Sequence, residues 1–254
     1  MISAESAVTP LSADQLRRFF SGHAESEYLV VDVRQPEEYA RQHLPGAQLV
    51  PLMEIEGGGA PLPPSEHGIF YCYSGQRSRR AAEHVAGFGV MHRVYTLDGG
   101  LLAWNGVTVP EFPNLQVFDG SGSLEQVLRR AMDLEKGAGR LYEWLCDHIE
   151  DARLRTMLTD LARSERVHAR ALYDMLGLCA EPPSTPFDPL YDRLAGDVLE
   201  SGEPLSRALA RLAPLEHEPA ALLELALHME FKALDLYRNL GELVAGGELV
   251  EMLL

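Results

Sequence analysis

The sequence predicts an α/β domain, with a parallel sheet flanked by helices, followed by an all-α helical bundle. Up to about residue 111, short β-rich runs alternate with amphipathic helical stretches, a pattern typical of parallel sheets. Residues 110–123 are rich in Pro, Gly, Asn, Asp and Ser, and from residue 124 onward only long segments with helical periodicity follow. A chain of 254 residues can hold two domains. We expect them at 1–113 and 124–254, with a linker at 114–123.

The first half contains four predicted strands and three predicted helices, separated by turn residues. Each strand is a short run of apolar and β-branched residues, and each helix shows apolar residues at helical spacing. The glycines and prolines of residues 57–64 predict a loop. The predicted strands are 28–33, 47–51, 68–73 and 94–97, and the predicted helices are 13–20, 36–42 and 77–88.

The second half contains five predicted helices and no predicted strand. Ser123 precedes the first long apolar repeat, so we expect it to cap that helix. The predicted helices are 124–149, 152–177, 188–200, 204–213 and 218–245.

The formal charge is −16, and the second half carries most of the acidic excess. Such a surface repels phosphate backbones and anionic lipids, so nucleic acids and membranes are not expected partners. Three cysteines are an odd and sparse set, which indicates reduced thiols and a cytoplasmic setting. No signal peptide or membrane span is predicted.

Cys72 ends an apolar strand and begins a short turn, CYSGQRS, that leads into a helix. A cysteine in this position faces unpaired backbone N–H groups and the positive end of the helix dipole. That environment lowers a thiol pKa and stabilises an anion on sulfur. The alternative is a buried core cysteine, but the flanking Ser, Gly and Arg favour function.

An internal repeat with an offset of 95 residues lies in the second half. AMDLEKGAGRLYEWL, from Ala131, matches ALHMEFKALDLYRNL, from Ala226, and the shared glutamates are Glu135 and Glu230. Apolar residues at helical spacing follow each glutamate, which predicts that both are buried. The helix after the first copy contains Glu165 and His168, three residues apart, whereas the second copy would reach its equivalents only beyond Leu254.

Helix bundles that hold two iron or manganese ions take one glutamate from each of two helices and a Glu-x-x-His from each of two others. The four residues above supply all but one Glu-x-x-His of that inventory. The alternative is that the glutamates lie at helix edges and that His168 is a packed core residue. The repeat favours the metal site.

The first half resembles the rhodanese family of sulfurtransferases. The resemblance rests on LVVDVRQPEEYARQHLPGAQLVPL (residues 29–52), on CYSGQRS (72–78), and on LDGG with the following Ala103 and Trp104. It implies that Cys72 accepts a sulfane sulfur as a persulfide and that Arg77 orients the loop, without a cofactor. It also implies a cradle of backbone amides, with Asp32 and Arg34 supporting the strand end. The implied substrate-binding residues are Tyr73, Ser74, Gly75, Gln76 and Ser78.

Two features of this loop narrow the expected chemistry. Related phosphatases place five residues between cysteine and arginine, whereas four lie between Cys72 and Arg77, a smaller ring that suits sulfur. Position 73, often basic in family members that act on thiosulfate, is tyrosine here. We therefore expect thiosulfate to be a poor donor.

The second half resembles the ferritin-like superfamily and, within it, the rubrerythrin-like proteins. The best-matching pieces are EKGAGRLYE (135–143) and LARSERVHARAL (161–172). The resemblance implies Glu135, Glu165, His168 and Glu230 as iron ligands, with Tyr142 and Tyr237 nearby. The given sequence ends before the second Glu-x-x-His would arrive, so three alternatives stay open: a C-terminal tail is missing from this sequence, only one metal binds, or the site has decayed into structure.

Three functional hypotheses follow. The first is a sulfurtransferase that moves sulfane sulfur through Cys72, from a small donor to a thiol or other nucleophile. The second is a di-iron peroxidase or oxidoreductase with an accessory rhodanese domain. The third treats the helical region as a non-catalytic dimerisation module. A bundle without a full fourth helix leaves an apolar groove, so we expect a homodimer through this region.

Overall fold

The computed structural model of the chain describes the ranges 8–58, 62–118, 123–177, 183–213 and 219–243, together with residue 179. Its contacts divide the chain into two compact units. The first contains the residues up to Phe112 and the end of the last helix from Tyr237, and the second contains Pro113–Leu236. Within the described residues, no helix combines the length and apolar character that crossing a membrane requires.

A five-stranded sheet forms the first unit, with strand order β1-β5-β4-β2-β3 and parallel pairing throughout. The parallel α/β architecture predicted from the sequence is confirmed. The edge strand β1 and the short helices α3 and α5 are additional to the predicted elements. The strands are β1 (Thr9–Leu11), β2 (Tyr28–Asp32), β3 (Gln48–Leu49), β4 (Ser65–Tyr71) and β5 (Met91–Leu97), and the helices are α1 (Ala13–Gly22), α2 (Pro36–Arg41), α3 (Leu52–Glu56), α4 (Gln76–Ala86) and α5 (Gly100–Ala103). Two short 3-10 turns occur at Glu25–Glu27 and Leu115–Phe118.

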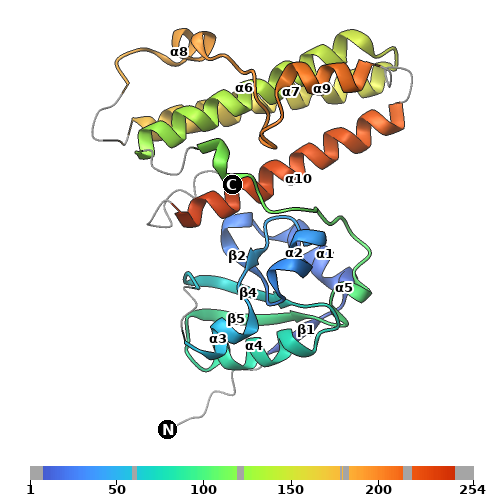
Figure 1. Cartoon of the computed structure of the whole chain (residues 1–254), viewed down its shortest axis with the longest axis vertical. Coiled ribbons are helices and arrows are strands. Elements are labelled where there is room, and N and C mark those ends of the chain that lie inside the picture. Colours follow the sequence, from blue (N-terminus) through green and yellow to red (C-terminus); the bar gives the residue numbers. More distant parts are fainter. Residues whose placement is uncertain are drawn as a thin grey trace. The chain divides into compact units, whose positions relative to one another are not determined.

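Alternate residues of the central strands enter two separate cores. Val31 and Phe70 pack with residues of α3 and α4, whereas Val30 and Ile69 pack with residues of α1, α2 and α5. Figure 1 shows these two helix groups on opposite sides of the sheet. Apolar burial on both faces explains why the strands read as nearly continuous apolar runs.

The second unit is helical, and α6 and α7 are its longest paired elements (Figure 1). Ser123 caps α6 as predicted, because its side chain accepts a hydrogen bond from the Gln126 N–H. Asp151 caps α7 in the same way. The helices are α6 (Leu124–His148), α7 (Ala152–Leu176), α8 (Phe187–Arg193), α9 (Leu205–Leu212) and α10 (Pro219–Leu243).

The predicted helix 188–200 is wrong in its second half, because α8 ends at Arg193. Residues 194–204, which we call the α8–α9 hairpin, form a turn closed by an antiparallel bridge between Val198 and Pro204. Gly196 adopts a positive φ of 56°, which is incompatible with continuing the helix. The apolar residues at helical spacing in this segment belong to a hairpin that packs on α6, and not to a continued helix.

Candidate functional site

Cys72 follows β4 directly, and its loop closes on α4. The Gly75 N–H donates a hydrogen bond to the Cys72 sulfur at 3.1 Å. Gly75 is the N-cap of α4 and has a positive φ of 89°, which favours glycine. Cys72 itself is buried, but Tyr73 and Ser74 beside it are exposed, so the sulfur lies one layer below the surface.

The loop is held with its carbonyl groups turned towards α5. The N–H groups of Leu101 and Leu102 donate to the carbonyls of Cys72 and Tyr73, at 2.9 and 3.1 Å. Gly100 permits this approach, since a Cβ on it would lie 2.4 Å from the Cys72 carbonyl oxygen. The conformation that satisfies these carbonyls leaves the loop N–H groups available to the sulfur.

The pKa of the Cys72 thiol is lowered by this arrangement. Burial alone would raise the pKa, but hydrogen bonds from Ser78, Ser74 and Gly75 to the sulfur outweigh it. Ser78 contributes both its N–H and its hydroxyl. The thiolate is therefore stabilised, although the residue is buried as the core-cysteine alternative requires.

The Arg77 guanidinium interacts with the Cys72 sulfur and, more strongly, with the Glu38 carboxylate. Its guanidinium donates two hydrogen bonds to the Glu38 carboxylate, at 2.7 and 2.8 Å, in a bidentate pair. Hydrogen bonding to Arg77 lowers the pKa of Glu38 to about 2. The pair ties the start of α4 to α2, which fixes the loop, and the sequence shows no local signal that would pair these two residues.

Asp32 and Arg34 form a second ion pair, and this one is almost fully buried. The Arg34 side chain contacts both carboxylate oxygens of Asp32, at 2.9 and 2.6 Å. It also donates to the Gln42 carbonyl at 2.7 Å. The pair therefore fastens the end of β2 to the turn that follows α2, beside the Cys72 strand.

A second cluster lies between α6 and α7. Nδ1 of His168 is 3.3 Å from a Glu135 oxygen and 3.2 Å from a Glu165 oxygen. One ligand atom from each residue lies within 4.8 Å of the others, so the three could hold one metal ion. Both glutamates are buried, but His168 is 54% exposed, which excludes the packed core histidine considered above.

Glu230 is placed differently from the other three predicted ligands. It is outside the tight group, and its Oε1 accepts a hydrogen bond of 2.6 Å from the Tyr142 hydroxyl. Burial and the Glu230 carboxylate raise the pKa of Tyr142, which keeps the phenol protonated as the donor. Tyr237 is also buried, near the end of α10.

Glu200 is a member of this region that the sequence reasoning missed. It lies on the α8–α9 hairpin, is 5% exposed, and interacts electrostatically with Glu135, Glu230 and His168. Burial and the nearby Glu135 raise its pKa. Neither the repeat nor the Glu-x-x-His spacing could have found it, because it belongs to an irregular segment.

The donor set fits a divalent metal ion. Two buried glutamates, Glu135 and Glu165, lie against the one imidazole of His168, and a charge imbalance of this kind is costly in a protein interior without a cation. Carboxylate oxygens with imidazole nitrogen are a donor set typical of iron and manganese. The proton on Nδ1 of His168 would be displaced by a metal ion.

Comparison with known proteins gives a family match for each half of the chain. Residues 12–106 match the family model described as a rhodanese-like domain. A protein named "Sulfurtransferase" from Allochromatium vinosum is 35% identical over 80 residues, covering 31% of this chain and 72% of the relative. The chain belongs to the rhodanese-like family. Another relative of this rhodanese-like protein, "Probable adenylyltransferase/sulfurtransferase MoeZ" from Mycobacterium tuberculosis, is 39% identical over 77 residues, 30% of the chain and 19% of the relative.

Residues 126–184 of the rhodanese-like protein match the family model described as Rubrerythrin, so the predicted ferritin-like region is confirmed. Among solved structures, a rhodanese homologue from the extremely thermophilic bacterium Thermus thermophilus aligns with 29% identity and a TM-score of 0.31, covering 37% of this chain and 98% of that chain. The chain spans between 19% and 54% of the length of the first four curated relatives it matches.

Proposed function

We propose that this protein is a sulfurtransferase that carries sulfane sulfur as a persulfide on Cys72. The observation that supports it most is the convergence of N–H and hydroxyl donors on one buried sulfur whose pKa is lowered. The Cys72 thiolate attacks the sulfane sulfur of a donor, a new S–S bond forms, and the donor leaves as an anion. A nucleophilic acceptor then attacks the outer sulfur, takes it, and restores the thiolate.

The charges around the loop support a donor other than thiosulfate. Arg77 is already paired with Glu38 and also interacts with the Cys72 sulfur, Arg34 is paired with Asp32, and an exposed tyrosine occupies position 73. A doubly charged anion gains little from ion pairs that are already satisfied. Low-molecular-weight persulfides are therefore the preferred donor class in this proposal, with a thiol as acceptor.

The test is persulfide formation by wild type and by Cys72→Ser, with Cys146→Ser and Cys179→Ser as controls. Both control cysteines are partly buried and lie in the helical unit. We expect cyanide-labile sulfur on wild type and on both controls, and none on Cys72→Ser. Label that persists on Cys72→Ser would contradict the proposal.

We further propose that the helical region binds iron through Glu135, Glu165, His168 and Glu230. The bound metal would supply redox chemistry, and this supports the alternative function as a di-iron peroxidase or oxidoreductase. The residues of the chain hold the ion, and the half-exposed His168 leaves the site open to solvent on one side. Metal analysis after anaerobic incubation with Fe²⁺ tests it: wild type should retain iron through dialysis, and Glu165→Gln should not.

Self-association of the helical region completes the proposal. Leu223 and Leu227, one turn apart on α10, are 44% and 48% exposed, and Val167 on α7 is 66% exposed. Exposed large apolar residues at helical spacing are typical of a helix with a partner. Light scattering should give the mass of a dimer, and a stable monomer would count against this part.

A further inference from the structure

Two exposed, largely apolar side chains lie beside the Cys72 loop, one on the loop itself and one on α5. Tyr73 is 47% exposed and Leu102 is 64% exposed, whereas Leu101 next to it is buried in the core of the first unit. Single exposed apolar residues are common on protein surfaces, but two of them beside a reactive sulfur need an explanation.

The backbone holds these two residues next to each other. The Leu102 N–H donates to the Tyr73 carbonyl at 3.1 Å, so both side chains leave backbone segments that are one hydrogen bond apart. The start of α5 also lies close against the loop, because a Cβ on Gly100 would be 2.6 Å from the Tyr73 carbonyl oxygen. The position of Leu102 beside the sulfur-bearing loop is therefore fixed by the fold. We call Tyr73 and Leu102 the apolar pair.

The two arginines that support the loop are already paired with carboxylates. Arg77 forms the bidentate pair with Glu38, and Arg34 is paired with Asp32 in the interior. The exposed residues at the start of the loop carry no charge: they are Tyr73, Ser74 and Gln76. A substrate that approaches the sulfur over these residues meets apolar surface and neutral polar groups.

We propose that Leu102, together with Tyr73, selects the sulfur donor: a persulfide R–S–SH whose group R is uncharged and apolar. R lies on the apolar pair while the outer sulfur reaches the Cys72 thiolate. Ligand sites are commonly lined by apolar and aromatic side chains with few polar groups, which agrees with this arrangement. The inference rests on the proposed sulfur transfer through Cys72, and it adds Leu102 and the chemical class of R.

The transfer from such a donor needs no further reactant. The Cys72 thiolate attacks the outer sulfur, a new S–S bond forms, and the bond between the two donor sulfurs breaks. The proton stays on the transferred sulfur, and the electron pair of the broken bond leaves with R–S⁻. Tyr73 and Leu102 take no part in this step, because their role is to bind R.

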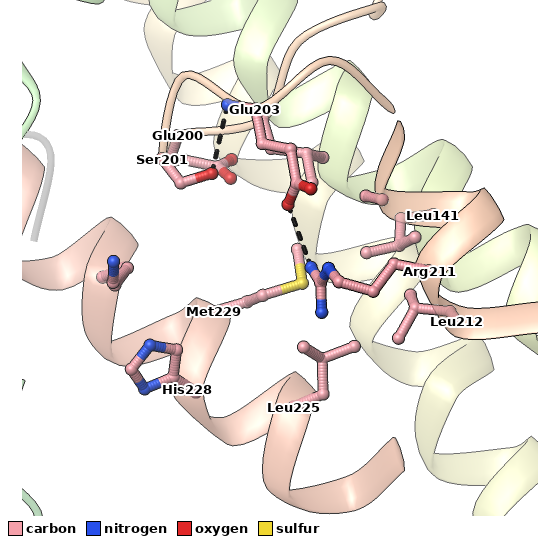
Figure 2. A pocket seen from close by; sticks show the side chains of 12 residues that line it. Leu141, Glu200, Ser201, Glu203, Arg211, Leu212, Leu225, His228 and Met229 are labelled. Atoms are coloured by element: carbon pink, nitrogen blue, oxygen red, sulfur yellow. Dashed lines mark hydrogen bonds and ion pairs between the residues drawn. The ribbon is translucent and has the colours of Figure 1, made fainter. Parts of the chain in front are cut away.

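The helical unit contains a separate place where a small apolar molecule could bind. Figure 2 shows Leu141, Leu212, Leu225 and Met229 around this cavity, whose volume is about 230 Å³. No cysteine is among the described residues that line it, so a donor bound there meets no thiol. The variant Leu225→Ala therefore separates binding in this cavity from binding beside the loop.

The test measures the rate constant for persulfide formation on Cys72 of the full-length protein with two donors, benzyl persulfide and 2-hydroxyethyl persulfide. The ratio of the two rate constants is divided by the same ratio for a free thiol, which removes the intrinsic reactivity of the donors. For wild type the corrected ratio should be about 10 in favour of benzyl persulfide, at the low end of what apolar contacts discriminate. Leu102→Ala should lower it by about 5-fold, because less apolar surface is covered.

The ratio also separates specificity from general damage, since a damaged Cys72 loop would slow both donors equally. Phe88→Ala is the matched control on the same unit. Phe88 is 67% exposed and follows the far end of α4, about 16 Å along an 11-residue helix from the loop. Phe88→Ala and Leu225→Ala should both keep the wild-type ratio.

A charge at position 102 provides a second readout. Leu102→Lys should slow the reaction with benzyl persulfide and speed the reaction with 4-carboxybenzyl persulfide, because an ammonium group then lies where the apolar side chain lay. An unchanged preference between these two donors would count against the contact between R and Leu102.

The possible failures are distinguishable. If neither donor places sulfur on Cys72 of wild type, the proposed function itself is wrong. If both donors do so and the corrected ratio for Leu102→Ala equals that of wild type, sulfur transfer stands and the role of Leu102 is overturned. An equal fall of the ratio in Phe88→Ala or Leu225→Ala would overturn it as well, because the preference would then not depend on the apolar pair.

Discussion

Removal of the Ser78 hydroxyl is the sharpest test of how the Cys72 anion is stabilised. The hydroxyl has a single proton, and it lies 3.2 Å from the Gly75 carbonyl oxygen while also reaching the Cys72 sulfur. When the thiol ionises, the proton can turn from the carbonyl to the negative sulfur. Ser78→Ala removes this one donor and leaves the backbone N–H donors in place.

The expected size of the effect follows from the strength of one hydrogen bond to a charged group, about 1.5–3 kcal/mol. One pKa unit corresponds to about 1.4 kcal/mol, so the thiol pKa should rise by about 1–2 units. At a pH below both midpoints the thiolate fraction then falls by about 10- to 100-fold. A thiolate with a higher pKa is also a stronger nucleophile, with a Brønsted slope near 0.45, which offsets part of this loss. The net loss in the rate of reaction at Cys72 is therefore about 3- to 12-fold.

The assay is the pH dependence of iodoacetamide alkylation of Cys72, in protein whose other two cysteines are replaced by serine. Ser74→Ala is the control, because Ser74 contributes its backbone N–H and not its hydroxyl. We expect the midpoint to rise for Ser78→Ala and to stay within a few tenths of a unit for Ser74→Ala. Equal midpoints for wild type and Ser78→Ala would refute the idea that this donor holds the anion.

Three further substitutions test the surrounding framework. Asp32→Asn leaves the Arg34 charge buried and unpaired, so the free energy of unfolding measured in urea should fall by about 3–5 kcal/mol. The Glu38 carboxylate has a pKa lowered to about 2, so it stabilises wild type fully above about pH 4.5 and less and less as the pH falls towards 2. The thermal midpoint of Glu38→Gln should therefore lie below that of wild type above about pH 4.5, and the difference should fade as the pH falls towards 2. Because Glu38 and Arg77 are each about a third exposed, the loss near pH 7 should be below about 1 kcal/mol. Gly137→Ala should displace the α8–α9 hairpin from α6 and lower the thermal midpoint, because its Cβ would lie 2.4 Å from the Val198 carbonyl oxygen.

Two matched substitutions separate the specific effects from general ones. Asp14→Asn breaks an exposed pair with Arg17 and should change stability by less than about 1 kcal/mol. Gly139→Ala adds a Cβ at an ordinary 3.5 Å from the Glu165 Cβ, so the thermal midpoint should change much less than for Gly137→Ala. If Gly139→Ala lowers the midpoint as much as Gly137→Ala, the hairpin contact is not the cause.

The sulfur site is predictable from the sequence because its donors are local. Cys72, Ser74, Gly75 and Ser78 lie within seven consecutive residues, so strand, turn and helix N-terminus together determine where the N–H groups point. The pairing of Arg77 with Glu38 and the hydrogen bonds from the N–H groups of Leu101 and Leu102 to the loop carbonyls are long-range, and no local pattern encodes them.

The carboxylate site is predictable only in part, for the opposite reason. The repeat finds Glu135 and Glu230 because regular helices give equal spacing on equal faces. Glu200 reaches the same region through a hairpin whose position depends on side chains 55 to 58 residues away in sequence, such as Lys136 and Arg140. Periodicity in residues 194–200 favours a helix, and the long-range contacts that override it leave no local trace.

The two sites balance negative charge in different ways, which gives a last prediction. At Cys72 the stabilising groups are N–H and hydroxyl donors of the loop and the Arg77 guanidinium, so one anion is stabilised without any added ion. At the glutamate cluster, within the described part of the chain, His168 is the group that offers a positive charge to several carboxylates, so the balance requires cations from solution. Stripping the metal from Co²⁺-loaded protein should therefore lower the thermal midpoint of the helical unit, while the alkylation midpoint of Cys72 stays within a few tenths of a pH unit. A larger shift on metal removal would mean that the sulfur anion is not stabilised by its own loop alone.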